Sequence, residues 1–211
     1  MYGGADNLNS QRRSSLLENH VGFKLESILQ YILRARDSYT QEHCQRVVTL
    51  AEAMGNHLGL GDRDMGMLSL TAAFHDIGKI GIPDNILLKS GGLTETEYEE
   101  IKGHSVIGAT MLRCPGHPLL DEVAECVLHH HEHWNGRGYP LGLKGEEIPL
   151  ISRIVAVVDS FDAMTTARSY RQPIDKTEAI QNIVELSGAQ FYPDAAHALR
   201  EIRRNVDSLC D

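Results

Sequence analysis

Apolar residues recur at helical spacing through most of this chain, and alternating strand patterns are almost absent. Such spacing places apolar side chains on one face of a helix. Asp62 is expected to cap one helix, and Thr94 with Glu97 forms a capping-box pattern for another. The sequence predicts an all-α, multi-helix bundle, with helices at 23–33, 47–58, 62–74, after 94, and at 119 to about 131, 152 to about 166, 176–186 and 193 to about 206.

Two long Gly/Pro segments separate these patterns, "IGIPDNILLKSGGLT" and "WNGRGYPLGLKGEEIP". Loops of this length in a compact domain are usually functional. Residues 1–20 are polar and aperiodic, which is typical of a tail or linker stub. We therefore expect one domain over 21–211, with its function close to these loops.

The composition excludes several classes of protein. A net charge of -9 argues against a broad surface for duplex nucleic acid or anionic lipid, although a few local cations could bind a small anion. The four cysteines have no CxxC spacing, which favours reduced thiols in a cytoplasmic protein. The N-terminus lacks the apolar segment of a signal peptide, and the apolar run "ISRIVAVV" is too short for a membrane span.

Histidine and aspartate residues within or beside the apolar patterns indicate a polar site inside the bundle. A lone histidine is usually a hydrogen-bonded core or surface residue. Several together are harder to accommodate, because each buried polar group without a partner costs about 1–3 kcal/mol. The residues concerned are His43, His75, Asp76, His104, His130, His131 and Asp159.

A metal cluster would satisfy these side chains. Imidazole suits borderline divalent metals, and Asp76, next to His75, has two oxygens with which to bridge two ions. The donor set is too rich in nitrogen for a dedicated magnesium or calcium cage and lacks the thiolates of structural zinc. The remaining candidates are iron, manganese, or a catalytic pair of zinc or nickel ions. Asp159 follows the apolar run "RIVAVV" and is expected to be buried and either paired or metal-bound.

Four segments resemble the signature blocks of the HD-GYP domain, a branch of the HD superfamily of metal-dependent phosphohydrolases. They are "HDIGKIGIPDNIL", "IKGHSVIGATML", "HHEHWNGRGYPLGLKGEEIP" and "ISRIVAVVDSFDAMTTARSYR". The resemblance extends from about Tyr39 to Pro193. It implies a helical domain that hydrolyses the bacterial second messenger cyclic di-GMP to linear pGpG and, in some members, to GMP.

The resemblance also implies the metal ligands, which by motif position are the same seven residues named above. His129, the remaining member of the histidine triplet, is expected to have only a helix-end role. Trinuclear members carry a Glu one turn before the first ligand, where this chain has Tyr39. Two divalent metals, most consistent with Fe or Mn, are therefore expected, although Glu42 or Asp37 could approach from elsewhere.

The expected mechanism follows from such a pair. Two metals about 3.5–4 Å apart activate a bridging water for in-line attack on the scissile phosphate. Asp76 and Lys79 are the expected catalytic residues, with the Lys79 ammonium approaching the non-bridging oxygens as negative charge develops. In isolation Lys79 would instead be a solvated loop lysine. No GxxxxGK[ST] phosphate loop is present.

Substrate contacts are expected from three motif segments. Arg168 and Arg171 in "ARSYR" occupy the family's phosphate- or base-contacting positions, and Lys79 joins them. Tyr139 can donate a hydrogen bond or stack, and Pro140 restricts the loop. The alternative for "NGRGYP" is a tight turn alone, and the two roles are compatible.

The chain departs from the family pattern at three places. Asn135 replaces the Asp of "WDG", Ser105 replaces a Pro, and "ARSYR" replaces the usual "RPYR" run. A non-catalytic cyclic-dinucleotide receptor or protein-interaction module is one alternative, and a phosphodiesterase for cyclic GMP-AMP is another. HD-GYP domains usually follow a sensor or receiver, and residues 1–36 are too short for one, so a sensor, receiver or GGDEF-type partner is a further expectation.

Overall fold

The computed structural model describes residues 38–113, 116–167 and 172–209, with side chains for 42–202 within these ranges. The described residues form helices and turns without a strand, which confirms the all-α prediction. The chain divides into two units, 1–41 and 42–211, and the second contains the hydrophobic core. No helix in the described ranges is long and apolar enough to cross a membrane.

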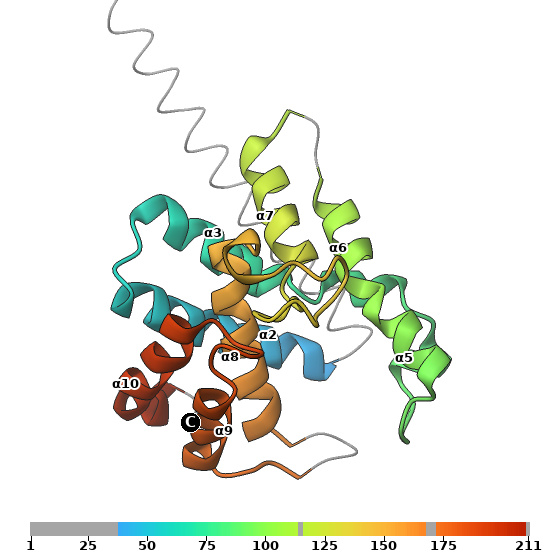
Figure 1. Ribbon diagram of the computed structural model, residues 1–211. Coiled ribbons are helices and arrows are strands. Elements are labelled where there is room, and N and C mark those ends of the chain that lie inside the picture. The colour runs from blue at the N-terminus through green and yellow to red at the C-terminus, as the bar shows by residue number, and fades with distance from the viewer. Residues whose placement is uncertain (1–37, 114–115, 168–171, 210–211) are drawn as a thin grey trace, which may run out of the picture. The chain divides into compact units, whose positions relative to one another are not determined.

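Figure 1 shows the elements in their order along the chain. They are α2 (Ser38–His57), α3 (Asp62–Phe74), the 3-10 helix η1 (Ile77–Gly81), α4 (Asp84–Leu87), α5 (Glu95–Lys102), α6 (His104–Leu112), α7 (Pro118–Leu128), the 3-10 helix η2 (Gly145–Glu147), α8 (Leu150–Thr165), α9 (Lys176–Glu185) and α10 (Pro193–Leu209).

Four details differ from the sequence prediction. Helix α2 begins at Ser38 and not at residue 47. Helix α7 ends at Leu128, because the next residues turn toward the interior site instead of continuing the helix. Gly61, not Asp62, is the N-cap of α3, and no side chain caps it. The first long loop contains η1 and α4. The helix expected at 23–33 and the domain boundary near residue 20 lie outside the described residues.

Helix α8 forms the centre of the core. It contacts α3, α7, α9 and α10, and its apolar run is fully buried from Ile154 to Phe161 on the inward face. Burying each such aliphatic or aromatic side chain contributes about 1.5–3 kcal/mol. Helices α2, α3, α9 and α10 add their own buried faces to the same cluster, and α7 adds Cys126. The two aspartates of α8 are therefore carried on a rigidly packed helix.

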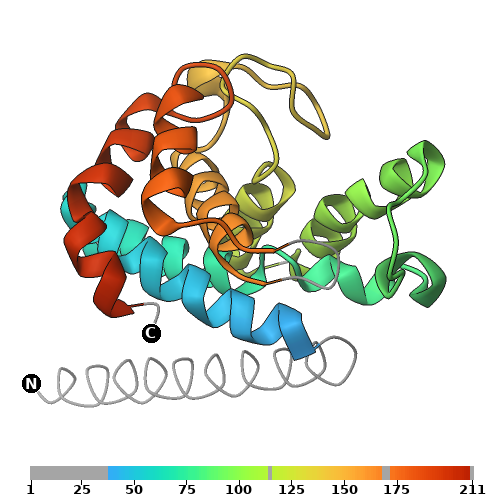
Figure 2. The ribbon, with the colours of Figure 1, turned by 90° about the horizontal axis from the view of Figure 1, so that it is seen from below.

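Helices α4 and α5 lie outside this core. Figure 2 shows the green α5 segment at the opposite side of the view from α10. Helix α5 buries no residue and begins with the predicted capping box, in which Thr94 accepts from the Glu97 N–H and Glu97 accepts from the Thr94 N–H. Local capping, together with the contact with α6, supports this segment.

A close backbone approach joins η1 to α6. A Cβ on Gly78 would lie 1.8 Å from the carbonyl oxygen of His104 and 2.5 Å from the backbone nitrogen of Gly108. Only glycine fits this approach without displacing backbone. It brings the His75–Asp76 pair next to the first residue of α6.

Candidate metal centre

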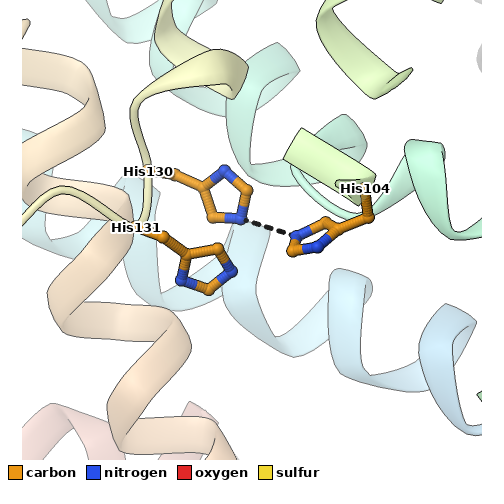
Figure 3. A group of neighbouring side chains, drawn as sticks. All are labelled: His104, His130 and His131. Carbon is orange, nitrogen blue, oxygen red and sulfur yellow. Dashed lines mark hydrogen bonds between the residues drawn. The ribbon is translucent and has the colours of Figure 1, made fainter. Parts of the chain in front are cut away.

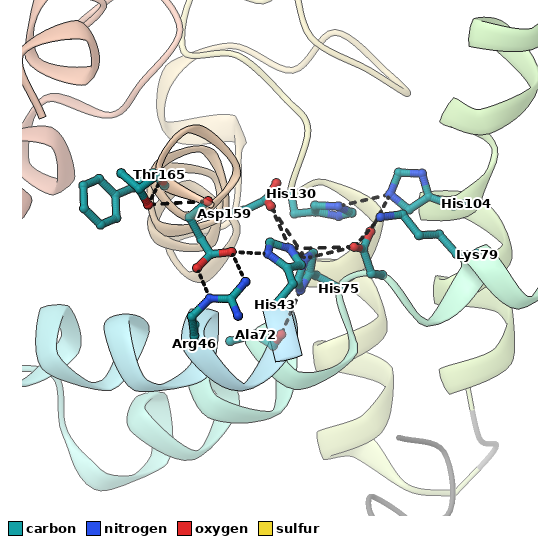
Figure 4. Close-up of polar contacts among 12 residues, drawn as sticks. His43, Arg46, Ala72, His75, Lys79, His104, His130, Asp159 and Thr165 are labelled. Atoms are coloured by element: carbon teal, nitrogen blue, oxygen red, sulfur yellow. Dashed lines mark hydrogen bonds and ion pairs between the residues drawn. The ribbon is translucent and has the colours of Figure 1, made fainter. Parts of the chain in front are cut away.

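The seven residues singled out in the sequence come together in the interior. Figure 4 labels His43, His75, His104, His130 and Asp159 among them. Six of the seven form two trios, and within each trio one possible ligand atom per residue lies within 4.8 Å of the others. Trio A is His43, His75 and Asp76, and trio B is His104, His130 and His131, shown in Figure 3. Asp159 adjoins trio A, with its Oδ1 3.1 Å from His43 Nε2. Its side chain is 16% exposed, so it is less buried than the apolar run predicts.

Asp76 belongs to trio A and also faces trio B. Its Oδ2 is 3.5 Å from His75 Nε2 and 3.8 Å from His43 Nε2, both in trio A. Its Oδ1 is 3.5 Å from His104 Nε2 in trio B. One carboxylate therefore turns an oxygen toward each trio, which is the arrangement that a bridging ligand requires.

Helix ends orient three of the histidines. The last carbonyls of a helix have no partner within the helix, and a nearby ring N–H can donate to them. In each case Nδ1 lies close to the carbonyl oxygen three residues earlier: His75 to Ala72 at 2.8 Å, His104 to Ile101 at 2.8 Å and His130 to Val127 at 2.6 Å. With the proton on Nδ1, each Nε2 has a free lone pair directed into the cluster.

The contacts between imidazole rings test whether a metal suits these residues. His43 Nε2 and His75 Nε2 are 3.2 Å apart, and His104 Nε2 and His130 Nε2 are 3.3 Å apart. His104 and His130 both place Nδ1 against a carbonyl, so the lone pairs of their Nε2 atoms face each other, which is unfavourable without a cation. Nitrogen and carboxylate donors around a shared point are what divalent transition metals prefer. The cluster could thus hold metal.

Burial and nearby charges shift the pKa values of the histidines in opposite directions in the two trios. Burial would lower the pKa of His43, but the carboxylates of Asp159 and Asp162 raise it to about 9. Burial lowers the pKa of His131 to about 3, and the pKa of His130 falls for the same reason. Carboxylates therefore favour a positive charge in trio A, whereas the imidazoles of His130 and His131 in trio B stay neutral at neutral pH.

Lys79 lies against Asp76, with Nζ 2.5 Å from Oδ2. Burial would raise the pKa of Asp76, but Lys79 and the histidines hold it well below its usual range. Burial would likewise lower the pKa of Lys79, yet Asp76 raises it above its ordinary value. Both groups therefore remain charged at neutral pH, and the ammonium is held at the edge of the cluster.

The Gly-Tyr-Pro loop packs on trio B. The ring of Tyr139 stacks on His131 with centroids 4.8 Å apart and an angle of 29°, and the bond to Pro140 is cis. Lys102 Nζ lies 5.4 Å from the Tyr139 ring centroid. The other predicted substrate contacts, Arg168 and Arg171, lie outside the described residues.

Three residues of this region were not anticipated from the sequence. Asp162 Oδ2 lies 2.6 Å from His43 Nδ1, and Arg46 binds the same carboxylate. Their spacing contained a signal, since Arg46 follows His43 by three residues and Asp162 follows Asp159 by three. Glu132 is the third, and no spacing indicated its role. It is buried, and its Oε1 accepts from the backbone N–H groups of 141 and 142, which ties the Gly-Tyr-Pro loop to the end of α7.

The remaining sequence features have local partners. His129 is the C-cap of α7 and is 2% exposed, with Nε2 3.1 Å from Glu125 Oε1, in keeping with a helix-end role. Asn135 Oδ1 accepts from the Arg137 N–H within the loop. Ser105 is buried, and its hydroxyl donates to the carbonyl of residue 102. These two departures from the family pattern are thus accommodated by hydrogen bonds.

Comparison with known proteins identifies a matching protein family and several similar proteins. The HD domain family model matches residues 27–195. A cyclic di-GMP phosphodiesterase of Thermotoga maritima is 41% identical over 187 residues, covering 89% of this chain and 51% of that protein. A 3'3'-cGAMP-specific phosphodiesterase of Vibrio cholerae is 34% identical over 169 residues, covering 80% of this chain and 32% of that protein. The chain therefore spans about half the length, or less, of these relatives.

Solved structures show the same fold. The crystal structure of a cyclic GMP-AMP-specific phosphodiesterase of V. cholerae has a TM-score of 0.64 and 25% identity, covering 86% of this chain and 48% of that one. The PgpH HD domain of L. monocytogenes in complex with cyclic-di-AMP has a TM-score of 0.61 and 21% identity, covering 86% and 93% of the two chains. The second likeness concerns the fold alone.

Proposed function

Because the chain belongs to the HD domain family, we propose that it is a metal-dependent phosphodiesterase that hydrolyses cyclic di-GMP to pGpG, with GMP as a further product. The observation that carries this proposal is the position of Asp76, with one oxygen facing each histidine-containing trio. Family membership also confirms the resemblance to the HD superfamily.

The proposed cofactor is a pair of divalent ions, Fe or Mn. Trio A with Asp159 would hold one ion, trio B the other, and Asp76 would contact both. When bound, such a pair lowers the pKa of water and neutralises negative charge on a phosphate. The donor set of five imidazoles and two carboxylates supports iron or manganese over magnesium or calcium. The side chain of Tyr39 lies outside the described residues.

Other residues would bind and orient the substrate. The Lys79 ammonium, held beside Asp76, would bind a non-bridging phosphate oxygen and stabilise the charge that develops there. Tyr139 would donate a hydrogen bond from its hydroxyl, since its ring already packs on His131, and Pro140 would keep the loop in place. Arg168 and Arg171 are proposed substrate contacts from the family resemblance alone.

The choice of cyclic dinucleotide has one serious alternative. Two of the similar V. cholerae proteins are named as specific for cyclic GMP-AMP. We favour cyclic di-GMP because the most similar of the relatives described above is named for it. We further propose that 21–211 acts as one domain in the cytoplasm, in keeping with the free buried thiols of Cys44 and Cys126. Its regulator would be a sensor, receiver or GGDEF-type partner.

Elemental analysis of anaerobically purified protein, paired with hydrolysis assays on the same sample, tests this proposal. About two metals per chain and linear pGpG from cyclic di-GMP are expected. Parallel assays with 3'3'-cGAMP and cyclic di-AMP measure base preference. His75→Ala and Asp76→Ala should lose both metal and hydrolysis, whereas the exposed Glu122→Gln should lose neither. Metal without turnover of any of the three dinucleotides would contradict the enzymatic role.

A further inference from the structure

His43 differs from the other oriented histidines in its position on its helix. His75, His104 and His130 lie at helix ends and donate from Nδ1 to carbonyls that the helix leaves free. His43 lies inside α2, where each carbonyl accepts the N–H four residues later. Its Nδ1 therefore needs an acceptor from another element.

Asp162 on α8 supplies this acceptor. Its Oδ2 lies 2.6 Å from His43 Nδ1, and its side chain is only 2% exposed. Arg46 binds both oxygens of the same carboxylate, with Nε 2.6 Å from Oδ1 and Nη2 3.0 Å from Oδ2. Guanidinium only donates and an ionised carboxylate only accepts, so the protonation states at this contact are defined.

The four residues form two facing pairs. His43 and Arg46 lie one turn apart on α2, and Asp159 and Asp162 lie one turn apart on α8. The imidazole of His43 consequently meets a carboxylate at each nitrogen, with Asp162 at Nδ1 and Asp159 at Nε2. Only the Nε2 side opens toward His75 and Asp76.

We propose that Asp162 and Arg46 are positioning residues that keep the proton on Nδ1 of His43, so that Nε2 presents its lone pair to a divalent metal in trio A. This inference rests on the metal centre proposed above. A carboxylate at the far nitrogen fixes the orientation of a ligand histidine and strengthens it as a donor. Arg46 fixes the carboxylate in turn.

The amide of Asn offers a sharp test, because it replaces one acceptor oxygen of Asp162 with a donor. In either orientation an N–H of the amide faces an N–H of Arg46. The contact to Arg46 Nε is the shorter of the two, at 2.6 Å, so we expect the amide to place its oxygen there and avoid two N–H groups facing each other at that distance. The NH2 group then points toward His43 Nδ1. His43 must then carry its proton on Nε2, which blocks the lone pair meant for metal. Removing Arg46 frees the amide to turn back.

Mn²⁺ titration of the full chain, followed by electron paramagnetic resonance, measures this effect. Changing the group that hydrogen-bonds a metal-ligating histidine typically costs about 10–100-fold in metal affinity, and Asp162→Asn should lose affinity in this range at one of the Mn²⁺ steps. The double variant Arg46→Met with Asp162→Asn should bind more tightly than Asp162→Asn alone. Arg63→Met and Glu122→Gln remove a similar Arg–carboxylate pair on the surface and should change nothing.

A second measurement needs no variant. In Zn²⁺-loaded unaltered protein, long-range ¹H–¹⁵N spectra should show His43 protonated at Nδ1 and unprotonated at Nε2. A proton on Nε2, unchanged affinity in Asp162→Asn, or no recovery in the double variant would overturn the inference. If the unaltered protein binds neither Mn²⁺ nor Zn²⁺, the metal centre itself is refuted. If it binds both metals but the variants and the His43 spectra do not behave as expected, only the role of Asp162 and Arg46 is refuted.

Discussion

At the scale of single residues, Lys79 pairs directly with Asp76, the carboxylate that faces both trios. Its ammonium compensates Asp76 and is the described group best placed to meet charge developing on a phosphate.

We predict that Lys79→Met retains bound metal and lowers the turnover number for cyclic di-GMP by about 100-fold or more, the usual cost of one lost transition-state donor. Metal content and steady-state kinetics measure the two effects separately. Lys89→Met removes a surface lysine that pairs with Glu97, 2.5 Å away, and should leave both unchanged. Equal turnover in Lys79→Met would remove its assigned role, and loss of metal would make Lys79 a structural partner of Asp76.

Glu97 is a residue away from the metal centre whose charge should make stability depend on pH. The hydrogen bond from Lys89, followed by that from the Thr94 N–H, lowers the pKa of Glu97 from 4.5 to about 2. A lowered pKa in the folded state stabilises the protein fully above pH 4.5, and this contribution is lost as the pH falls toward 2.

The free energy of unfolding in urea should therefore differ between unaltered protein and Glu97→Gln by a constant amount at pH 5–7. The difference should shrink as the pH falls from 4.5 toward 3. Glu95→Gln removes the same charge from the same helical turn without the capping-box contact, and it serves as the matched control. A difference that does not change with pH would contradict the charge-based account.

At the scale of elements, the approach of η1 to α6 decides whether the two trios meet. Gly78 permits this approach, since any Cβ there would collide with the carbonyl of His104. Because that carbonyl belongs to the backbone, no side-chain rotation can relieve the collision.

Gly78→Ala should lower the free energy of unfolding by about 1–3 kcal/mol or more, as overpacking does, and should weaken metal binding by separating Asp76 from trio B. Gly66→Ala is the matched control, because Gly66 lies within α3 with no atom within 4 Å of its added Cβ. That change should stabilise the helix by about 0.5–1 kcal/mol. For each variant, chemical denaturation measures the free energy of unfolding and Mn²⁺ titration measures the metal affinity. Full stability and full metal affinity in Gly78→Ala would show that the backbone can yield.

At the scale of the whole molecule, the candidate ligands connect segments far apart in the chain. Trio A and Asp159 lie on α2, at the α3–η1 junction and on α8. Trio B lies at the start of α6 and just after the end of α7. A bound metal pair would therefore join most of the described helices that surround the site.

Metal removal is thus expected to destabilise the entire fold and not one loop. A ligand that binds only the folded state adds about 2.7 kcal/mol at 100 times its dissociation constant. Calorimetric melting with a chelator, with Mn²⁺ and with Mg²⁺ tests this, and Mg²⁺ should shift the melting temperature less because it prefers oxygen ligands. Equal melting temperatures with chelator and with Mn²⁺ would contradict a metal that links the elements.

The amino-acid sequence was enough to predict the all-α class, most helix positions, the Thr94–Glu97 capping box and the seven candidate ligands. These depend on periodicity and on the chemistry of neighbouring residues, which are local properties of the chain. The tertiary structure alone decided how the candidates group into two trios and that Glu132 holds the Gly-Tyr-Pro loop. It also decided that Asp162, 119 residues from His43, orients that imidazole. Such contacts depend on how distant helices pack, and a local pattern does not encode that packing.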